Sequence, residues 1–240
     1  MSGLRAAVWG ASGGIGQALV DALVSSGEYA SIHAGSRAPA PRRSPIVRPF
    51  AFDLLDEESI AASARAISHE GAVDLVIVAT GMLHTGRHRP EKQFAALGTE
   101  AMMAAFRVNA IGPALIAKHM VGAFPRDRRS VFAALSARVG SIGDNRLGGW
   151  HSYRASKAAL NMIIANLAIE LARTHPQAIA VGLHPGTVDT ALSLPFRKSI
   201  PPGSLFSPAT SARHLLSVVA GLEERDSGAV WAWDGQRIVP

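Results

Sequence analysis

Tyr153 and Lys157 stand four residues apart in a segment with a helical pattern, so both side chains are expected on one helix face. A tyrosine with an ordinary pKa of about 10 is a poor acid–base catalyst at neutral pH. A lysine ammonium beside it would favour the phenolate and lower that pKa. The pair could therefore move a proton to or from a substrate oxygen, although this spacing also occurs by chance.

Three glycines, Gly10, Gly14 and Gly16, follow the first strand-like run and open the first helix-like segment. A backbone without side chains can turn tightly there and approach a pyrophosphate, which the N–H groups and positive dipole of a helix N-terminus would hold. Glycines also serve ordinary turns, and the spacing G-x-x-x-G-x-G differs from the commoner G-x-G-x-x-G. The position between a strand and a helix nevertheless favours a dinucleotide-binding turn.

The second strand-like run is followed by Gly35, Ser36 and Arg37, where an acidic residue would favour NAD. Ser36 and Arg37 could instead hold a 2′-phosphate through charge-assisted hydrogen bonds, with Arg42 or Arg43 adding to the field. The alternative is a solvated basic loop. We expect NADP(H) to be preferred over NAD(H).

Short apolar runs alternate with helix-period segments along the chain, which predicts βαβ units around a parallel sheet. The length of 240 residues suits one domain, 1–240. We therefore expect a single-domain, doubly wound α/β fold of the Rossmann type, with about seven parallel strands and helices on both faces. The expected strands are Ala6–Trp9, Ala30–Ala34, Ile46–Phe52, Val73–Ala79, Ser130–Leu135, Ile179–Leu183 and Ala229–Trp233, and the expected helices are Ile15–Ser25, Glu57–His69, Thr99–Gly122, Ser152–Thr174 and Pro208–Leu222.

Two irregular stretches interrupt this alternation. Pro39, Pro41 and Pro45 make a helix between Gly35 and Ile46 improbable. Residues 187–207 follow a strand and predict a substrate loop.

Composition excludes several classes of protein. The chain has no cysteine, so disulfides and thiolate metal sites are impossible, and we expect a cytoplasmic location. The net charge of +6 is dispersed, with the densest basic groups at residues 37–43 and 126–129, and the latter reads as a solvated turn. We expect no nucleic-acid partner and no membrane span. His84 and His88 have no carboxylate at ligand spacing, so no metal site is expected.

A family resemblance joins these motifs. The run G-A-S-G-G-I-G at residues 10–16, Ser136 after the fifth strand, Y-R-A-S-K at 153–157 and H-P-G-T-V-D-T at 184–190 together resemble the short-chain dehydrogenases/reductases. The stretch from Ser136 to Tyr153 resembles more narrowly the C-factor and sniffer-like carbonyl reductase branch. The resemblance covers essentially the whole chain.

The resemblance implies four catalytic residues. Tyr153 would exchange a proton with a carbonyl or alcohol oxygen, and Lys157 would tune Tyr153 and bind the nicotinamide ribose. Ser136 would hydrogen-bond the substrate oxygen, with Ser141 as the alternative, and Asn109 would anchor a water linking Lys157 to solvent. The implied cofactor contacts are Gly10, Ser12, Gly14, Ile15, Gly16, Ser36, Arg37, Asp53, Leu54, Ala79, Gly81, Tyr153, Lys157, Pro185, Gly186, Val188 and Thr190. The chain departs from the family after the fourth strand, where the usual Asn-Ala-Gly is replaced by Ala79-Thr80-Gly81 and the asparagine is absent.

Trp150, Leu192 and Phe196 could form an apolar substrate wall or pack against the domain. His151 could line the pocket or merely sit in its loop, and Asn161 is interpreted as a surface or capping residue. The expected function is hydride transfer between NADP(H) and a carbonyl or alcohol. The alternative is a dinucleotide-binding signalling or redox-sensing protein with little turnover. The length argues against a nucleotide-sugar epimerase or dehydratase.

The resemblance also implies assembly into a homodimer or homotetramer. The helices expected at 99–122 and 152–174 are long and rich in alanine. In the family, the equivalent pair of helices forms the dimer interface.

Overall fold

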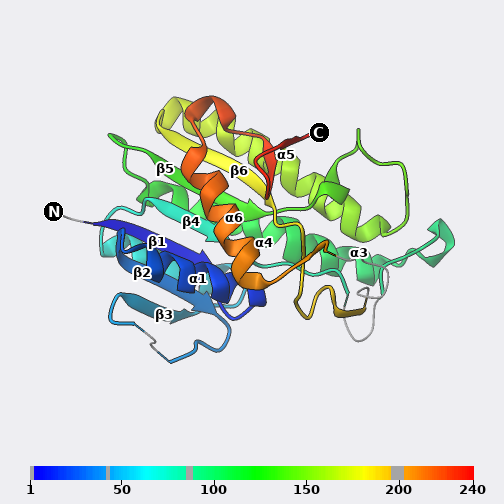
Figure 1. Ribbon diagram of the computed structural model, residues 1–240, viewed down its shortest axis with the longest axis horizontal. Coiled ribbons are helices and arrows are strands. Elements are labelled where there is room, and N and C mark those ends of the chain that lie inside the picture. The colour runs from blue at the N-terminus through cyan, green and yellow to red at the C-terminus, as the bar shows by residue number, and fades with distance from the viewer. Residues whose placement is uncertain (1–2, 42–43, 85–88, 196–202) are drawn as a thin grey trace.

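The computed structural model describes residues 3–41, 44–84, 89–195 and 203–240. Its main feature is an eight-stranded sheet with the order β10-β9-β6-β5-β4-β1-β2-β3 (Figure 1). Seven strands run parallel, as the sequence predicts, and β10 is an additional antiparallel strand against β9. The strands are β1 (Leu4–Trp9), β2 (Tyr29–Ser36), β3 (Val47–Ala51), β4 (Leu75–Val78), β5 (Ser130–Leu135), β6 (Ala178–His184), β9 (Val230–Ala232) and β10 (Arg237–Ile238).

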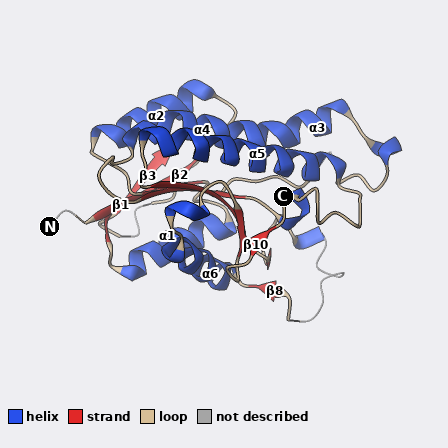
Figure 2. Cartoon of the chain, turned by 90° about the horizontal axis from the view of Figure 1, so that it is seen from above, coloured by secondary structure: helices blue, strands red, loops and turns tan. Residues whose placement is uncertain are grey.

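Helices cover both faces of this sheet, which gives the molecule three layers (Figure 2). Side chains alternate between the faces along each strand. Ala6 and Val8 of β1 therefore pack in one core cluster with residues of α1 and α6, while Ala7 and Trp9 pack in the other with residues of α2, α4 and α5. This confirms the doubly wound α/β class. The helices are α1 (Gly14–Ser26), α2 (Glu57–His69), α3 (Thr99–Phe106), α4 (Gly112–Met120), α5 (His151–Thr174) and α6 (Pro208–Gly221).

The strand order reverses between β1 and β4, because the chain moves outward from β1 to β3 and then returns to the other side of β1. In open α/β sheets, ligands bind at the carboxyl ends of the strands beside such a switch point. Gly10, directly after β1, lies close to the backbone of Ala79 and Thr80, which follow β4. The topology thus places the glycine turn at the position where a ligand is expected.

The helix expected over residues 99–122 is interrupted. A π-helical turn, Arg107–Ile111, separates α3 from α4, and Pro113 stands in the first turn of α4. Single π-turns are rare and often lie at functional sites. Here the turn carries the buried Asn109.

α5 is the longest described helix, with 24 residues, and by length and composition alone it could cross a membrane. In this fold Leu160, Ile164 and Leu171 are buried in the core cluster beside the sheet. One face of α5 is therefore committed to packing within the domain.

The two ends of the predicted substrate loop pair with each other as short strands. Strand β7 (Thr187–Val188) pairs with β8 (Leu205–Phe206) as a separate two-stranded sheet, which the sequence pattern did not predict.

The stretch after β2 contains no helix among its described residues, as its prolines predict.

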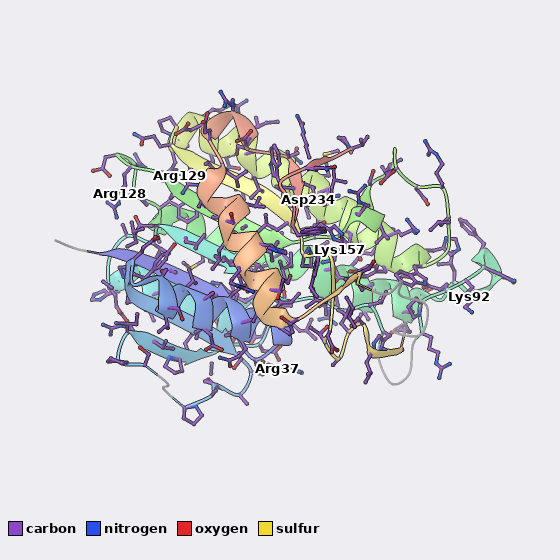
Figure 3. The ribbon with its side chains drawn as sticks, viewed as in Figure 1. Arg37, Lys92, Arg128, Arg129, Lys157 and Asp234 are labelled. Carbon is purple, nitrogen blue, oxygen red and sulfur yellow. The ribbon has the colours of Figure 1, made fainter. Side chains whose placement is uncertain are left out.

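The basic group at residues 126–129 is not simply a solvated turn. Arg128 Nε donates to the carboxylate of buried Asp74 at 2.8 Å, and Arg129 donates to the carbonyl oxygens of Val219 and Leu222. That interpretation was wrong for these two arginines, because both contact segments distant in sequence. Figure 3 shows them at the end of the molecule away from Lys157.

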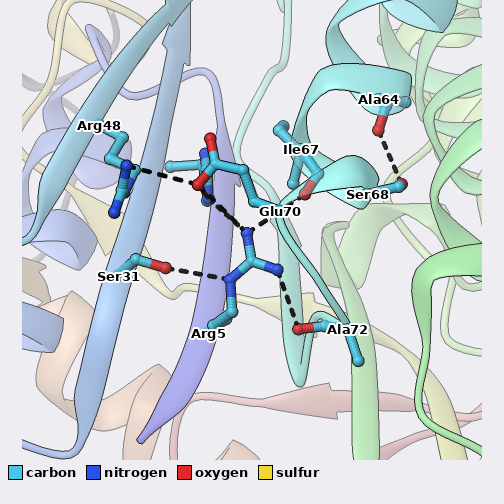
Figure 4. Close-up of polar contacts among 9 residues, drawn as sticks. Arg5, Ser31, Arg48, Ala64, Ile67, Ser68, Glu70 and Ala72 are labelled. Atoms are coloured by element: carbon cyan, nitrogen blue, oxygen red, sulfur yellow. Dashed lines mark hydrogen bonds and ion pairs between the residues drawn. The ribbon is translucent and has the colours of Figure 1, made fainter. Parts of the chain in front are cut away.

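Arg5 organises the amino ends of the strands (Figure 4). Its guanidinium donates to Ile67 O at 3.2 Å and to Ala72 O at 3.3 Å, and so caps the carboxyl end of α2. It also donates to Ser31 Oγ and forms an ion pair with Glu70. This network braces the sheet at the edge opposite the carboxyl ends of the strands.

Candidate active site

A cavity of about 950 Å³ opens at the carboxyl ends of the parallel strands. Segments far apart in sequence converge on it: the glycine turn, the ends of β4, β5 and β6, and the start of α5. It is lined by Gly13, Gly14, Ile15, Arg37, Ala79, Thr80, Gly81, Leu83, Leu135, Ser136, Ala137, Arg138, Val139, Asp144, Arg146, Leu147, Trp150, Tyr153, Arg154, Lys157, His184, Pro185, Gly186, Thr187, Val188, Thr190, Ala191, Leu192 and Ser193.

Tyr153 and Lys157 lie in the first two turns of α5, and both line this cavity, as the four-residue spacing predicts. Lys157 Nζ is 5.9 Å from the centre of the Tyr153 ring and donates a hydrogen bond to Leu135 O at 2.7 Å. Lys157 is thus held by the end of β5 at the cavity wall (Figure 3).

Burial shifts both groups toward their neutral forms. It raises the pKa of Tyr153 to about 12 and lowers the pKa of Lys157 to about 7. The direction for Tyr153 is opposite to the expected lowering, because Lys157 bonds to a backbone carbonyl and does not donate to the phenol. Tyr153 therefore keeps its proton at neutral pH and is suited to donate it.

Ser136 lies directly after β5 and lines the cavity. Its hydroxyl donates to Asn161 Oδ1 at 2.6 Å. The interpretation of Asn161 as a surface or capping residue was therefore wrong: the side chain is partly buried against Ser136. Asn161 is one turn beyond Lys157, so the same helical spacing that pairs Tyr153 with Lys157 could have revealed it. Ser141 instead contacts Asp144 and Pro240, and it does not line the cavity.

Asn109 is fully buried behind the cavity. Its amide exchanges two hydrogen bonds of 2.8 Å with the backbone of Met82 and donates a third to Ser156 Oγ at 3.0 Å. A Cβ placed on Gly81 would lie 3.8 Å from Asn109 Oδ1 and 3.9 Å from Lys157 Nζ. Asn109 therefore braces the segment after β4 against α5, and its link to a water stays a prediction.

The glycine turn has the shape that a bound phosphate needs. Gly10 adopts a φ of +99°, and a Cβ on Gly16 would collide with the Gly10 carbonyl. No side chain caps the N-terminus of α1, and its first turn has no acidic residue. Thr80 beside it lines the cavity, and its buried Oγ1 has no hydrogen-bond partner among the described residues. These features fit the pyrophosphate of a dinucleotide.

The residues predicted to hold the adenosine end separate into two groups. Arg37 is exposed at the edge of the large cavity (Figure 3), and Ser36 and Ser12 line a smaller cavity of about 220 Å³ next to it. Asp53 and Leu54 line neither cavity. The Asp53 carboxylate accepts from Leu55 N, and Leu54 packs against Gly112, so their cofactor contacts stay predictions.

The segment after β6 forms the opposite wall. Pro185, Gly186, Val188 and Thr190 all line the cavity, and the Thr190 side chain approaches Gly14 at the start of α1. Gly186 has a φ of +75°, and a Cβ there would lie 2.7 Å from the Phe206 ring, so this position requires glycine.

Two of the four predicted substrate residues, Trp150 and Leu192, line the cavity. His151 does not; it packs on the Phe94 ring, with centroids 4.4 Å apart. Phe196, like His88 and the pair Arg42/Arg43, lies outside the described residues. The described residues contain no group of three or more His, Asp or Glu side chains that could hold a metal.

Fold and site together place the chain in the class of doubly wound α/β proteins with a dinucleotide-type glycine turn. A family model described as short chain dehydrogenase matches residues 5–200, and the chain belongs to that family of oxidoreductases. This confirms the resemblance given by the sequence motifs.

Individual proteins are also similar to the chain. The C-signal of Myxococcus xanthus is 30% identical over 138 residues, covering 57% of this chain and 77% of the relative. The structure of an NADPH-bound carbonyl reductase from chicken fatty liver superposes with a TM-score of 0.84 and 24% identity, covering 100% of this chain and 96% of that chain. The carbonyl reductase Sniffer of Drosophila melanogaster superposes with a TM-score of 0.85 and 19% identity, with 100% of both chains covered.

Proposed function

We propose that the protein is an NADP(H)-dependent oxidoreductase that transfers hydride between the nicotinamide and a carbonyl or alcohol substrate. One observation carries the proposal: Tyr153, Lys157 and Ser136 line the same cavity as the glycine turn. A reactive oxygen and a dinucleotide could therefore occupy one continuous space.

When bound, the nicotinamide supplies or accepts the hydride. In the direction of reduction, Tyr153 donates its proton to the substrate oxygen, so that hydride and proton together convert the carbonyl to an alcohol. Ser136, held at the cavity wall by Asn161, supplies a second donor to that oxygen once its hydroxyl proton turns from Asn161 Oδ1 to the substrate. Lys157, whose Nζ is 5.9 Å from the centre of the Tyr153 ring, stabilises the phenolate that remains when its amine is in the ammonium form.

The preference for NADP(H) rests on the residues that follow β2. Arg37 reaches the cavity edge, and the position where an acidic side chain would bind a ribose is occupied by Ser36. The NADPH-bound state of the chicken reductase supports the same preference. Replacing Arg37 by Ala is expected to weaken NADPH binding and to leave NADH binding nearly unchanged.

The alternative is a cofactor-binding signalling or redox-sensing protein, which the similarity to the C-signal of Myxococcus xanthus favours. The pairing of Ser136 with Asn161 and the buried Lys157 favour an enzyme, because a binding module needs neither.

We also propose a homo-oligomer, because Met162 and Ile169 on α5 are 63% and 57% exposed. A cytoplasmic location stays part of this proposal.

The test is a fluorescence titration with NADPH and with NADH, followed by turnover assays on a panel of carbonyl compounds. The chain has two tyrosines, so Tyr29→Phe, at the start of β2, is a matched control for Tyr153→Phe. Tyr153→Phe should lower kcat by about 10²- to 10⁴-fold, the usual contribution of acid–base catalysis, and should leave NADPH binding intact. Near-normal turnover in Tyr153→Phe would refute the assigned role. NADPH binding without turnover in the unmodified protein would favour the signalling alternative.

A further inference from the structure

Glu91 is a buried carboxylate that lies far in sequence from any expected catalytic motif. It lies in the segment between β4 and α3, and only 6% of the residue is exposed. Sequence reasoning gave it no role. Burying a carboxylate is costly unless hydrogen bonds compensate for the lost water. Its partners therefore indicate what the protein gains from placing it there.

The hydrogen-bond partners of Glu91 from other described residues belong to the start of α5. One carboxylate oxygen accepts from Ser152 Oγ, the other accepts from Ser152 N at 3.2 Å, and the backbone oxygen of Glu91 accepts from Trp150 N at 2.5 Å. Ser152 immediately precedes Tyr153. A negative charge at a helix N-terminus interacts favourably with the helix dipole. Burial, the largest single influence, opposes ionisation of Glu91, but the hydrogen bonds from Ser152 and from the backbone N–H of Glu91 itself, together with the charge of His151, outweigh it and hold the pKa of the carboxyl below its ordinary value.

The residue that Glu91 holds, Trp150, has an unusual backbone. Gly148, Gly149 and Trp150 adopt φ values of 61°, 64° and 50°, and Trp150 is the non-glycine residue with positive φ in the described chain. A side chain with a Cβ rarely adopts this conformation, which persists where the surroundings impose it. From the other side, Arg154 Nε donates to Gly148 O at 3.1 Å and to Gly149 O at 3.0 Å. The turn is thus fixed from two sides.

The fixed turn bears on the active site. Trp150 lines the cavity, and its ring centre is 6.3 Å from that of Tyr153. Figure 3 shows Lys92, which follows Glu91 in the sequence, at the end of the molecule opposite Arg128. Glu91 contacts neither the cavity nor the glycine turn. Any effect it has on catalysis must therefore act through Trp150 and the first turn of α5.

We propose that Glu91 is a positioning residue of the active site: its carboxylate fixes Ser152 at the N-terminus of α5 and its backbone oxygen holds Trp150, so that Trp150 stands as a rigid wall of the substrate cavity and Tyr153 faces the substrate oxygen. The catalytic part of this inference rests on the proposed function. It makes Trp150 a residue that selects among substrates by size.

The test compares Glu91→Gln with Glu58→Gln, a matched change at an exposed glutamate on α2. Glutamine keeps the shape but can no longer accept from both Ser152 donors. kcat per NADPH-binding site should fall about tenfold, the loss expected for one misplaced hydrogen bond to a charged group. The ratio of kcat/KM between a bulky and a small carbonyl substrate should also change. The NADPH dissociation constant should stay within about twofold of its original value, because the cofactor contacts are untouched. Glu58→Gln should change none of these quantities.

A purely structural role would lower thermal stability, while kcat per NADPH-binding site and the substrate ratio stayed at their original values; that result would overturn the inference. Ser152→Ala removes one of the same hydrogen bonds and keeps the charge, so it serves if Glu91→Gln does not fold. It should shift the substrate ratio in the same direction.

Hydrogen exchange separates this inference from the proposed function. The amide of Ser152 is bonded to Glu91, so exchange in residues 150–153 should accelerate in Glu91→Gln whether or not the protein turns over a substrate. Unchanged exchange in this segment would refute the positioning role. Accelerated exchange in a protein without turnover would support the positioning role of Glu91 and refute only the proposed function.

Discussion

Gly16→Ala is expected to damage the glycine turn by a simple steric route. The new Cβ would lie 2.9 Å from the Gly10 carbonyl carbon and closer still to its oxygen, and both are backbone atoms that cannot rotate away. Overpacking of this kind lowers the free energy of unfolding by about 3 kcal/mol at the upper end of its usual range. The better helix propensity of alanine offsets about 1 kcal/mol of that loss. The net loss is about 2 kcal/mol, which lowers the Tm by about 4–8 °C for a chain of this size.

Gly221→Ala provides the matched control, because Gly221 ends α6 and a Cβ there meets nothing within 4 Å. Its Tm should stay the same or rise slightly. Thermal unfolding is measured for both variants with and without NADPH. Gly16→Ala should also weaken NADPH binding about tenfold, because the start of α1 must move away from β1. A Gly16→Ala protein with the original Tm and NADPH affinity would refute the close packing of this turn.

Three further predictions follow from other parts of the molecule. The pKa of Lys157 is about 7 in the folded chain and 10.5 in the unfolded chain, so the unfolded chain binds more protons between these values. The free energy of unfolding should therefore rise with pH from about 7 to about 10. In urea unfolding experiments, Lys157→Met should lack this rise. Arg5→Met should lower the free energy of unfolding by about 3 kcal/mol, measured in urea, because Ile67 O and other buried acceptors lose their charged donor. Met162→Asp combined with Ile169→Asp should convert an oligomer to a monomer in light scattering; an unchanged mass would exclude this face as the interface.

The order of strands and helices could be predicted because it depends on local periodicity and turn residues. Ser130–Leu135 and Glu57–His69 were predicted with the bounds that the structure shows. The π-turn at Arg107–Ile111 was missed, because one wider turn within a continuous helical stretch leaves no separate signal in the sequence. The short antiparallel β10 was missed because two residues carry no periodic signal.

The features of the candidate active site also divide into local sequence patterns and contacts between residues far apart in sequence. The glycine turn and the Tyr153–Lys157 pair are local patterns, so the sequence by itself determined them, whereas their meeting in one cavity depends on the tertiary structure. The contacts of Glu91 with Ser152 and of Ser136 with Asn161 join residues 61 and 25 positions apart. Only the tertiary structure decided these contacts, because the packing of β4, β5 and α5 against one another brings such residues together and no local spacing encodes it. The same packing turned His151 away from the cavity and toward Phe94.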